Sequence, residues 1–206
     1  MKLATRQIYK KVAVRDGLDA ILLPRPVVVA TCVDAKGKPN AITLAWCSPV
    51  SHRPLVVAIA ISPKRYSHNL VANAGEFVLN FPSIDLAEEV NWMGRKSGSK
   101  YDKFAVTGVT LEPAKEVNAP VIRECYAHLE CKVINQVAAG DHTTFFGQVV
   151  HAEVAEGSLQ KVKQGGPPAY YFDPKMIKTL QHLGGDMYLT NTEEYVEFKV
   201  EGVIDV

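Results

Sequence analysis

The segment Ser62–Asn69 carries the side chains that a phosphate-binding site needs. Lysine, arginine, serine, histidine and asparagine follow directly on an apolar run, Leu55–Ile61, and precede a helical pattern. The first N–H groups of a helix have no intrahelical acceptor, and the helix dipole adds partial positive charge there. Arg65 could hold a phosphate in bidentate geometry, assisted by Lys64, the Ser67 hydroxyl and those N–H groups. The alternative is an ordinary helix start, capped by a serine or asparagine side chain, with solvated charges.

The run Asn40–Ser48 has the composition of a surface on which a flat ring can lie. Ala45 and Ser48 are small, so a ring system can approach the backbone, and Thr43 adds a hydroxyl. Trp46 could pack against that ring. The alternative is an ordinary strand with its tryptophan in the core.

A third candidate is the corner Gly140-Asp141-His142, which lies between two strand-like runs. Glycine permits positive φ, which suits a tight turn and directs the next side chains outward. His142 could then donate a hydrogen bond to a bound ring or relay a proton. The alternative is a plain turn with an exposed histidine.

Several other chemistries lack their signatures in this sequence. There is no GxGxxG loop, no GxxxxGK[ST] loop and no GxSxG elbow. The histidines lack the spacing of a zinc helix, and the four cysteines form no CxxC pair, so we expect no metal site and buried free thiols. Cys47 is the cysteine closest to the polar positions. A net charge of +1 does not favour a nucleic-acid or acidic-membrane partner.

The candidate residues lie between segments that predict mostly β structure. Gly75 ends the second expected helix, Ser83 caps the third, and the glycine and lysine density of residues 94–109 indicates a mobile surface loop. Many strands with short turns and few helices predict a mainly β fold, a closed or partly closed antiparallel barrel. The expected strands cover residues 25–33, 40–48, 55–61, 76–81, 124–137, 143–154 and 195–200, and the expected helices residues 17–23, 66–74 and 84–93.

The size and composition of the chain are those of one globular domain. With 206 residues, 47% of them hydrophobic, it can bury a full core, so we expect a single domain over residues 1–206. The first residues do not have the apolar core of a signal peptide. No run approaches the roughly 20 apolar residues of a membrane span. We therefore expect a cytoplasmic protein.

In their order and spacing, these segments resemble the flavin reductase-like family of FMN-binding split barrels, close to its flavoredoxin branch. The resemblance extends from about Leu18 to Val154, which implies a core of about residues 18–155 and a C-terminal extension, 156–206. It implies a homodimeric Greek-key split β-barrel that holds FMN near the subunit interface. The matching segments are Arg25-Pro26, Asn40-Ala41-Ile42-Thr43, Pro54, Lys64 to Asn69, Phe77 to Pro82, His128 to Cys131, Gly140-Asp141-His142 and Phe146 to Val149.

The resemblance also implies which residues bind the cofactor. His142 is expected to face the nicotinamide as the catalytic residue. The expected FMN-binding residues are Thr43, Leu44, Ala45, Trp46, Cys47 and Ser48 along the isoalloxazine ring, Arg65, Ser67, His68 and Asn69 at the phosphate and ribityl chain, Asn80 and Pro82 at the pocket border, and Lys100, Tyr101 and Lys103 in a closing loop.

The implied activity is NAD(P)H-dependent flavin reduction. Hydride transfer to a flavin needs no protein nucleophile, because the protein has only to stack two rings and exclude water. One alternative is a flavoredoxin-type FMN electron carrier that is reduced by a redox partner protein. A third possibility, from another class, is a barrel that has lost its flavin and serves as a binding or dimerisation module.

Overall fold

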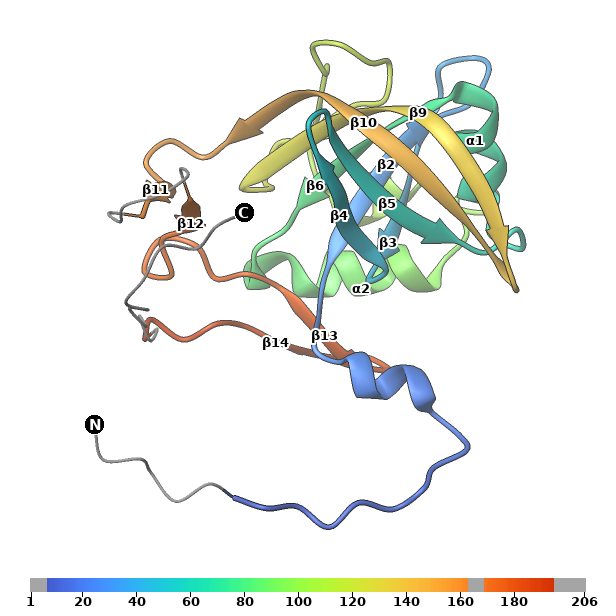
Figure 1. Ribbon diagram of the computed structural model, residues 1–206. Helices are drawn as coiled ribbons and strands as arrows, with labels where there is room; N and C mark the ends of the chain where they lie inside the picture. The colour runs from blue at the N-terminus through green and yellow to red at the C-terminus, as the bar shows by residue number, and fades with distance from the viewer. Residues whose placement is uncertain (1–6, 163–168, 195–206) are drawn as a thin grey trace.

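A seven-stranded antiparallel sheet, rolled on itself, forms the body of the protein (Figure 1). The computed structural model describes residues 7–162 and 169–194. The strand order is β3-β2-β6-β9-β10-β5-β4, and the sheet does not close. The fold is therefore mainly β and an incompletely closed barrel, as predicted. The strands are β2 (Val28–Val33), β3 (Pro39–Leu44), β4 (Cys47–His52), β5 (Leu55–Ile61), β6 (Glu76–Phe81), β9 (Ala127–Ala139) and β10 (His142–Val154).

The prediction of one continuous strand over residues 40–48 is wrong. The chain leaves β3 at Leu44 and starts β4 at Cys47, and these strands are the two opposite edges of the sheet. β3 pairs with β2, whereas β4 pairs with β5. Between them, the carbonyl of Trp46 accepts a hydrogen bond from the N–H of Ala60, 3.1 Å away. The strand breaks because the chain changes its pairing partner there, which a run of strand-forming residues does not reveal.

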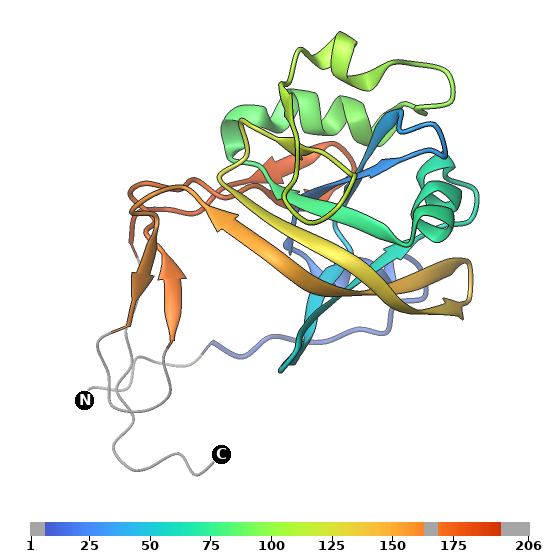
Figure 2. The same ribbon diagram turned by 90° about the horizontal axis from the view of Figure 1, so that it is seen from above.

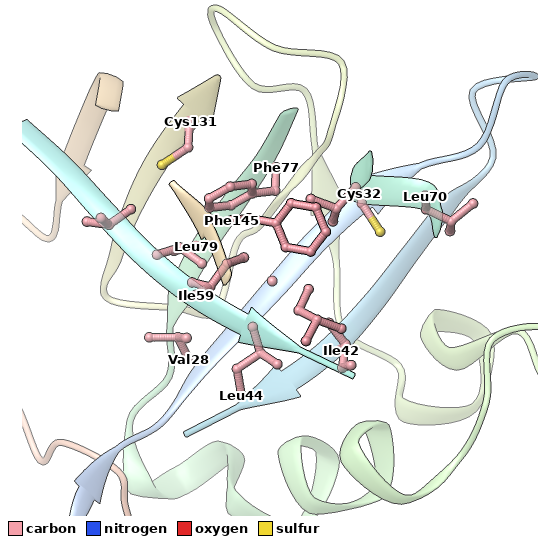
Figure 3. Packing of buried hydrophobic residues seen from close by; sticks show 14 residues of the cluster. Val28, Cys32, Ile42, Leu44, Ile59, Leu70, Phe77, Leu79, Cys131 and Phe145 are labelled. Carbon is pink, nitrogen blue, oxygen red and sulfur yellow. The ribbon is translucent and has the colours of Figure 1, made fainter. Parts of the chain in front are cut away.

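The main hydrophobic core fills the inside of the rolled sheet, with Phe77, Phe145 and Ile59 at its centre (Figure 3). A second core lies on the other side of β2, under helix α2 (Ala87–Arg95), and contains Val29 and Met93. All six residues of β2 are buried, because alternate side chains face the two cores. This explains why β2 is apolar at every position except Thr31.

The first two α-helices follow the sequence pattern closely. α1 (Tyr66–Ala74) has the predicted bounds, and Gly75 ends it with φ of 68°. The next expected helix, residues 84–93, is a 3-10 turn, η2 (Ile84–Leu86), that continues into α2. Ser83 occupies the N-cap position, but its hydroxyl hydrogen-bonds the Asp85 carboxylate at 3.2 Å instead of a backbone N–H.

The prediction of a mobile loop over residues 94–109 is wrong in its second half. A short helix, α3 (Lys103–Thr107), begins there, capped by the Asp102 side chain, which accepts a hydrogen bond from Ala105 N. Lys103 is only 4% exposed, and Phe104 packs against the second core. The second half of this segment is therefore packed against the protein, because the side chains of Lys103 and Phe104 point inward from it.

The β9–β10 hairpin crosses the whole molecule and turns at Gly140-Asp141, as predicted (Figure 2). Gly140 has φ of 62°, the left-handed conformation for which glycine is favoured. The remaining short elements are η1 (Leu18–Leu22), β7 (Leu111–Glu112), β8 (Val121–Ile122), β11 (Leu159–Lys161) and β12 (Tyr170–Phe172).

The C-terminal part of the chain returns to the barrel. β13 (Gln181–Gly184) pairs with β1 (Arg25–Pro26) and with β14 (Met187–Leu189), so segments more than 150 residues apart in the sequence lie side by side (Figure 1). Leu180 accepts a hydrogen bond from Val27 N through its carbonyl, and its side chain belongs to the second core. The strand expected over residues 195–200 lies outside the described residues. Within the described part, no helix is long and apolar enough to cross a membrane.

Candidate functional site

Three of the hollows on the protein surface meet at Gly94, near the end of α2. A Cβ on Gly94 would lie 3.2 Å from the Cβ of Thr43 on β3, so helix and strand approach closely here. We call the three the cationic hollow, next to the start of α1, the aromatic hollow, at the β3–β4 corner, and the hairpin hollow, under β13 and β14.

The cationic hollow has the charge of an anion site. Lys64, Arg65, Lys96 and Lys103 all line it, and no carboxylate of the described residues does. Arg65 is the N-cap residue of α1 and its side chain makes no capping bond, so the first N–H groups of the helix stay uncapped. Helix dipole and side-chain charge therefore act in the same direction, toward a negative ligand.

Ser67 adds a hydroxyl to the cationic hollow. It is buried, and its oxygen accepts a hydrogen bond from Asn40 Nδ2 at 2.7 Å. Since that oxygen is occupied as an acceptor, the hydroxyl proton can be directed at an acceptor in the hollow. The contact also fixes β3 against the first turn of α1.

Lys103 is an internal cation beneath the same hollow. Its ammonium donates to the carbonyl of Ala41 at 2.7 Å and to that of Met93 at 2.6 Å. Met93 lies in the last turn of α2, where the helix dipole favours positive charge. Burial, with a smaller effect from Arg65, lowers the pKa of Lys103 to about 8. An ammonium has three donors, so one is left for an acceptor in the hollow.

The loop after α2 passes directly over Asn40. A Cβ on Gly98 would lie 1.8 Å from Asn40 Oδ1, so a larger residue would displace the loop or the Asn40 amide. Asn40 Oδ1 is buried without a hydrogen-bond partner among the described residues. The path of this wall of the cationic hollow therefore depends on a glycine.

The aromatic hollow is lined by flat groups from three elements. The rings of Trp46 and His142 lie with their centroids 4.6 Å apart and their planes tilted by 38°. The guanidinium of Arg25 lies over the Trp46 ring, with its Cζ 5.7 Å from the ring centroid. His142 Nδ1 is 2.7 Å from the Asp141 carboxylate, which lowers the pKa of Asp141. This end of the site suits a planar ring system.

Three side chains with ionisable groups line the aromatic hollow but were not predicted from the sequence: Asp19, Arg25 and His182. Arg25 and His182 are register partners in β1 and β13, and Arg25 Nη2 donates to Asp19 Oδ2 at 3.1 Å. From the sequence, Arg25 is only part of a segment that matches the family, with no role in the site. His182 carries no local signal, because only the pairing of β13 with β1 brings it to the site.

The hairpin hollow is held together by contacts between α2 and the β13–β14 hairpin. Tyr188 donates its hydroxyl to Asn91 Oδ1 at 3.1 Å. Arg95 donates from Nε to Asp186 Oδ1 at 2.7 Å and from Nη2 to the Gly185 carbonyl at 2.8 Å. These bonds fix the hairpin against the end of α2 at which the hollows meet.

The structure brings about half of the predicted site residues together. The predicted residues that line the aromatic or the cationic hollow are Thr43, Leu44, Ala45, Trp46, Arg65, Ser67, Lys103 and His142. The predicted residues that lie outside the three hollows are Cys47, Ser48, His68, Asn69, Asn80, Pro82, Lys100 and Tyr101. Thr43 lines a hollow but uses its hydroxyl internally, donating to the Val90 carbonyl at 2.6 Å.

The residues outside the hollows have other contacts. Cys47 and Ser48 form the start of β4, paired with β5. His68 Nε2 lies 2.8 Å from Thr143 Oγ1, and His68 Nδ1 is 3.1 Å from Asn69 Oδ1. Lys100 and Tyr101 are exposed. Cys47 and Ser48 therefore contribute to the pairing of β4 with β5, and His68 and Asn69 to the contact between α1 and β10.

Asn80 is a structural residue of the sheet. It is fully buried, donates to the Val29 carbonyl at 3.0 Å and accepts from Ile122 N at 2.7 Å. The neighbouring Pro82 is buried as well. Asn80 thereby ties β6 to β2 and β8, because one amide group can serve donors and acceptors on both sides.

The four cysteines are free, in agreement with the absence of CxxC spacing. Burial raises the pKa of Cys47 to about 11 and that of Cys32 to about 12. A thiol with so high a pKa is protonated at neutral pH and is a poor nucleophile.

The chain belongs to the family of flavin reductase-like domains. The family model, described as a flavin reductase like domain, matches residues 21–179. An uncharacterized protein of Archaeoglobus fulgidus is 36% identical over 173 residues, which cover 84% of this chain and 92% of that protein. The resemblance drawn from the sequence motifs is thereby confirmed.

Solved structures with similar folds include two flavoredoxins. That of Methanosarcina acetivorans is 25% identical, with a TM-score of 0.77 and coverage of 94% of this chain and 97% of that one. That of Desulfovibrio vulgaris (Miyazaki F) is 24% identical, with a TM-score of 0.76 and coverage of 92% and 97%. The second likeness shows the fold alone.

Proposed function

We propose that the protein binds FMN and acts as an NAD(P)H-dependent flavin reductase. The observation that carries the proposal is the continuity of the cationic and aromatic hollows, which share Ile42, Arg65 and Gly94. FMN is a flat ring joined to a phosphate by a flexible chain, and this site offers an uninterrupted path from a ring-binding end to an anion-binding end. Family membership and the flavoredoxin neighbours support the same assignment.

The residues present fit the phosphate group of FMN. Arg65 and Lys64 supply side-chain charge, Ser67 a hydroxyl, and α1 its first N–H groups. Lys103 adds charge from below. A phosphate dianion can accept from several donors at once, so these groups act together without competing.

The residues of the β3–β4 corner fit the ring. The strand break at Ala45 exposes backbone and small side chains, and Trp46 and His142 close one rim. When bound, FMN supplies a ring system that takes up a hydride and releases electrons. The residues of the chain hold and orient the ring, and they keep water from it. His142, held by Asp141, is in place to keep a proton at this rim.

A second candidate function is that of an FMN electron carrier reduced by a partner protein, as in flavoredoxins. It uses the same site and is favoured by the likeness to the flavoredoxin of Methanosarcina acetivorans. The net charge of +1 does not suggest a strong docking patch for a redox partner, which tilts the proposal toward the reductase. A cytoplasmic location is proposed for either function.

We also propose that the protein is a homodimer. Val50 on β4, Ile134 and Val137 on β9, and Val150 on β10 are exposed apolar side chains on strands that lie close together in the sheet. A second copy of the chain would remove them from water. Light scattering after size-exclusion chromatography should give twice the chain mass; a monomer would contradict this proposal.

The decisive experiment on function is an anaerobic absorption spectrum of the FMN-reconstituted, desalted protein. We expect flavin bands that bleach promptly on addition of NADH or NADPH, and the faster nucleotide identifies the donor. Bands that persist until dithionite is added would replace the reductase by the electron carrier. Protein without flavin bands would overturn both and leave a barrel with another role.

The buried lysine predicts a pH dependence of FMN affinity. The Lys103 ammonium carries its charge below its pKa of about 8, so FMN affinity is expected to fall about tenfold between pH 7 and pH 9.5, the loss of about one charge-assisted hydrogen bond. In Lys103→Met the affinity should be lower and flat over this range. Fluorescence titration with FMN measures both, and riboflavin, which has no phosphate, is the control that should not respond.

The titration of Lys103 would not cause the same fall in FMN affinity through loss of folded protein. The native pKa of Lys103 is depressed, so above pH 8 the unfolded chain binds more protons than the native protein, and this group makes folding more favourable as pH rises. A wild-type affinity that stays constant to pH 9.5 would show that Lys103 does not reach the phosphate.

A further inference from the structure

We propose that the cationic hollow binds small aldehydes that carry a phosphate, and that Lys103 joins them covalently as an imine. This inference goes beyond the proposed function, because it concerns a covalent ligand and does not require that the protein bind FMN. It depends on the position of the Lys103 nitrogen, on the charges around that nitrogen and on the phosphate donors beside it.

Two carbonyl groups hold the Lys103 nitrogen at the base of the hollow. The carbonyl oxygen of Ala41 on β3 lies 2.7 Å away, and that of Met93 on α2 lies 2.6 Å away. A neutral amine has two N–H groups and one lone pair, so these two oxygens accept both of its hydrogens. No third partner exists among the described residues, and Lys103 lines the hollow. The lone pair of the neutral amine is therefore free to attack a ligand there.

The Lys103 amine is neutral far more often than the amine of an ordinary lysine. Burial, with a smaller effect from Arg65, lowers its pKa to about 8. About one Lys103 side chain in ten is then neutral at pH 7, against about one in 2,500 for a lysine with the usual pKa of about 10.4. Loss of solvent and a neighbouring cation are the two ways in which proteins activate lysines for imine formation.

The charges around Lys103 keep its pKa low. Cys32 on β2 favours the charged amine, but burial raises the pKa of this thiol to about 12, so it carries no charge near neutral pH. β3 has no ionisable side chain, and the Asp102 carboxylate, which caps α3 by accepting from Ala105 N, does not line the hollow. The ionisable side chains that line the hollow with Lys103 are Lys64, Arg65, Tyr66, Arg95 and Lys96.

The phosphate donors select which aldehydes react. Arg65, the Ser67 hydroxyl and the uncapped first N–H groups of α1 lie in the same hollow as Lys103. A phosphate bound to them holds the rest of a small molecule close to the amine, which raises the effective concentration of its aldehyde. The aromatic hollow continues from Arg65 and Gly94, so an aldehyde on a flat ring also has space.

The covalent step balances without a further reagent. The Lys103 lone pair attacks the aldehyde carbon, and the carbonyl oxygen leaves as water, which takes up the two hydrogens of the amine. The product is a C=N double bond. Once protonated by solvent, the imine nitrogen has one N–H, which can remain on one of the two carbonyls.

The test is labelling of the full chain, freed of any flavin, with pyridoxal 5′-phosphate at pH 7.5. Brief reactions are stopped with sodium borohydride, which adds a hydride to the imine carbon and fixes the adduct as an amine. Peptide mass spectrometry then measures the labelled fraction of each lysine. We expect Lys103 to react at least 20-fold faster than Lys36, an exposed lysine in the turn between β2 and β3. Because this comparison is made within the wild-type protein, it does not depend on the folding of a variant.

Three further probes test the role of the phosphate. Pyridoxal has the same aldehyde without the phosphate and should label Lys103 at least tenfold more slowly. Arg65→Ala should slow labelling by pyridoxal 5′-phosphate at least tenfold and leave labelling by pyridoxal within about threefold. Glyceraldehyde 3-phosphate has a phosphate and an aldehyde but no ring, and whichever phosphate labels Lys103 faster identifies the source of the ligand.

The pH profile and two variants identify the reacting amine. Between pH 7 and pH 9.5 the labelling rate of Lys103 should rise about tenfold and level off above its pKa, whereas that of Lys36 should rise more than about 100-fold. Lys103→Met should lose the fast adduct. Lys36→Met, the same change at the exposed turn, should keep it.

Three results would overturn the inference. Lys103 that reacts no faster than Lys36 would show that the two carbonyls do not leave a nucleophilic amine. Equal rates with pyridoxal and with its phosphate would show that the hollow does not select phosphorylated aldehydes. A Lys103 rate that rises more than 100-fold over the pH range would be that of an ordinary lysine.

Discussion

Replacing Arg65 with alanine is expected to raise the dissociation constant for FMN about 100-fold and to leave that for riboflavin within about threefold. Arg65 lines the cationic hollow and stands at the N-cap of α1, where its side chain makes no capping bond that folding would lose. A bidentate bond between a guanidinium and a phosphate contributes about 3 kcal/mol, which corresponds to about 100-fold in affinity. Fluorescence titration with each flavin measures the two constants.

The control for this prediction is Arg53→Ala, which removes the same charge at an exposed turn outside the three hollows. It should change FMN affinity less than twofold, since exposed charges at a distance are screened by salt. Equal losses for FMN and riboflavin in Arg65→Ala would mean that Arg65 shapes the site without contacting the phosphate. Unchanged FMN affinity would place the phosphate elsewhere.

Replacing Asn80 with leucine is expected to lower the free energy of unfolding by about 3 kcal/mol. The substitution leaves the buried N–H of Ile122 without its acceptor and removes the donor to the Val29 carbonyl. Each buried polar group left unsatisfied costs about 1–3 kcal/mol, and leucine provides no replacement. Urea unfolding followed by tryptophan fluorescence measures the loss.

This prediction separates a structural from a cofactor-binding role for Asn80. Under conditions where Asn80→Leu is folded, its FMN affinity should equal that of the wild type. Asn73→Leu, the same change at an exposed position of α1, should alter stability by less than about 0.5 kcal/mol. A stable Asn80→Leu protein with weakened FMN binding would return Asn80 to the pocket border proposed from the sequence.

Local signals predicted the elements that depend on local physics. The bounds of α1, its end at Gly75, the strand β6 and the turn at Gly140-Asp141 all follow from periodicity and from where glycine is needed. The proposed phosphate end of the site shares this property, since Arg65 and Ser67 lie at the start of one helix. Residues on one element keep their relative positions in any fold that contains the element.

The errors occur where long-range pairing overrides local pattern. The break at Ala45-Trp46 arises because β3 and β4 pair with different strands. Helix α3 is packed because its Lys103 donates hydrogen bonds to two carbonyls on other elements. A lysine-rich stretch is normally a solvated loop. Its own sequence cannot show that the carbonyls of Ala41 and Met93 will accept hydrogen bonds from one of its lysines.

The sequence by itself therefore determined the fold class, the family and the bounds of α1, whose start is the proposed anion site. Only the tertiary structure decided that Asn80 holds strands together, that Lys103 is an internal cation, and that His182 reaches the site. These roles depend on partners supplied by other strands and by the far end of the chain. The physical reason is that burial and hydrogen-bond partners are set by which segments pack together, whereas propensity and periodicity act only along the chain.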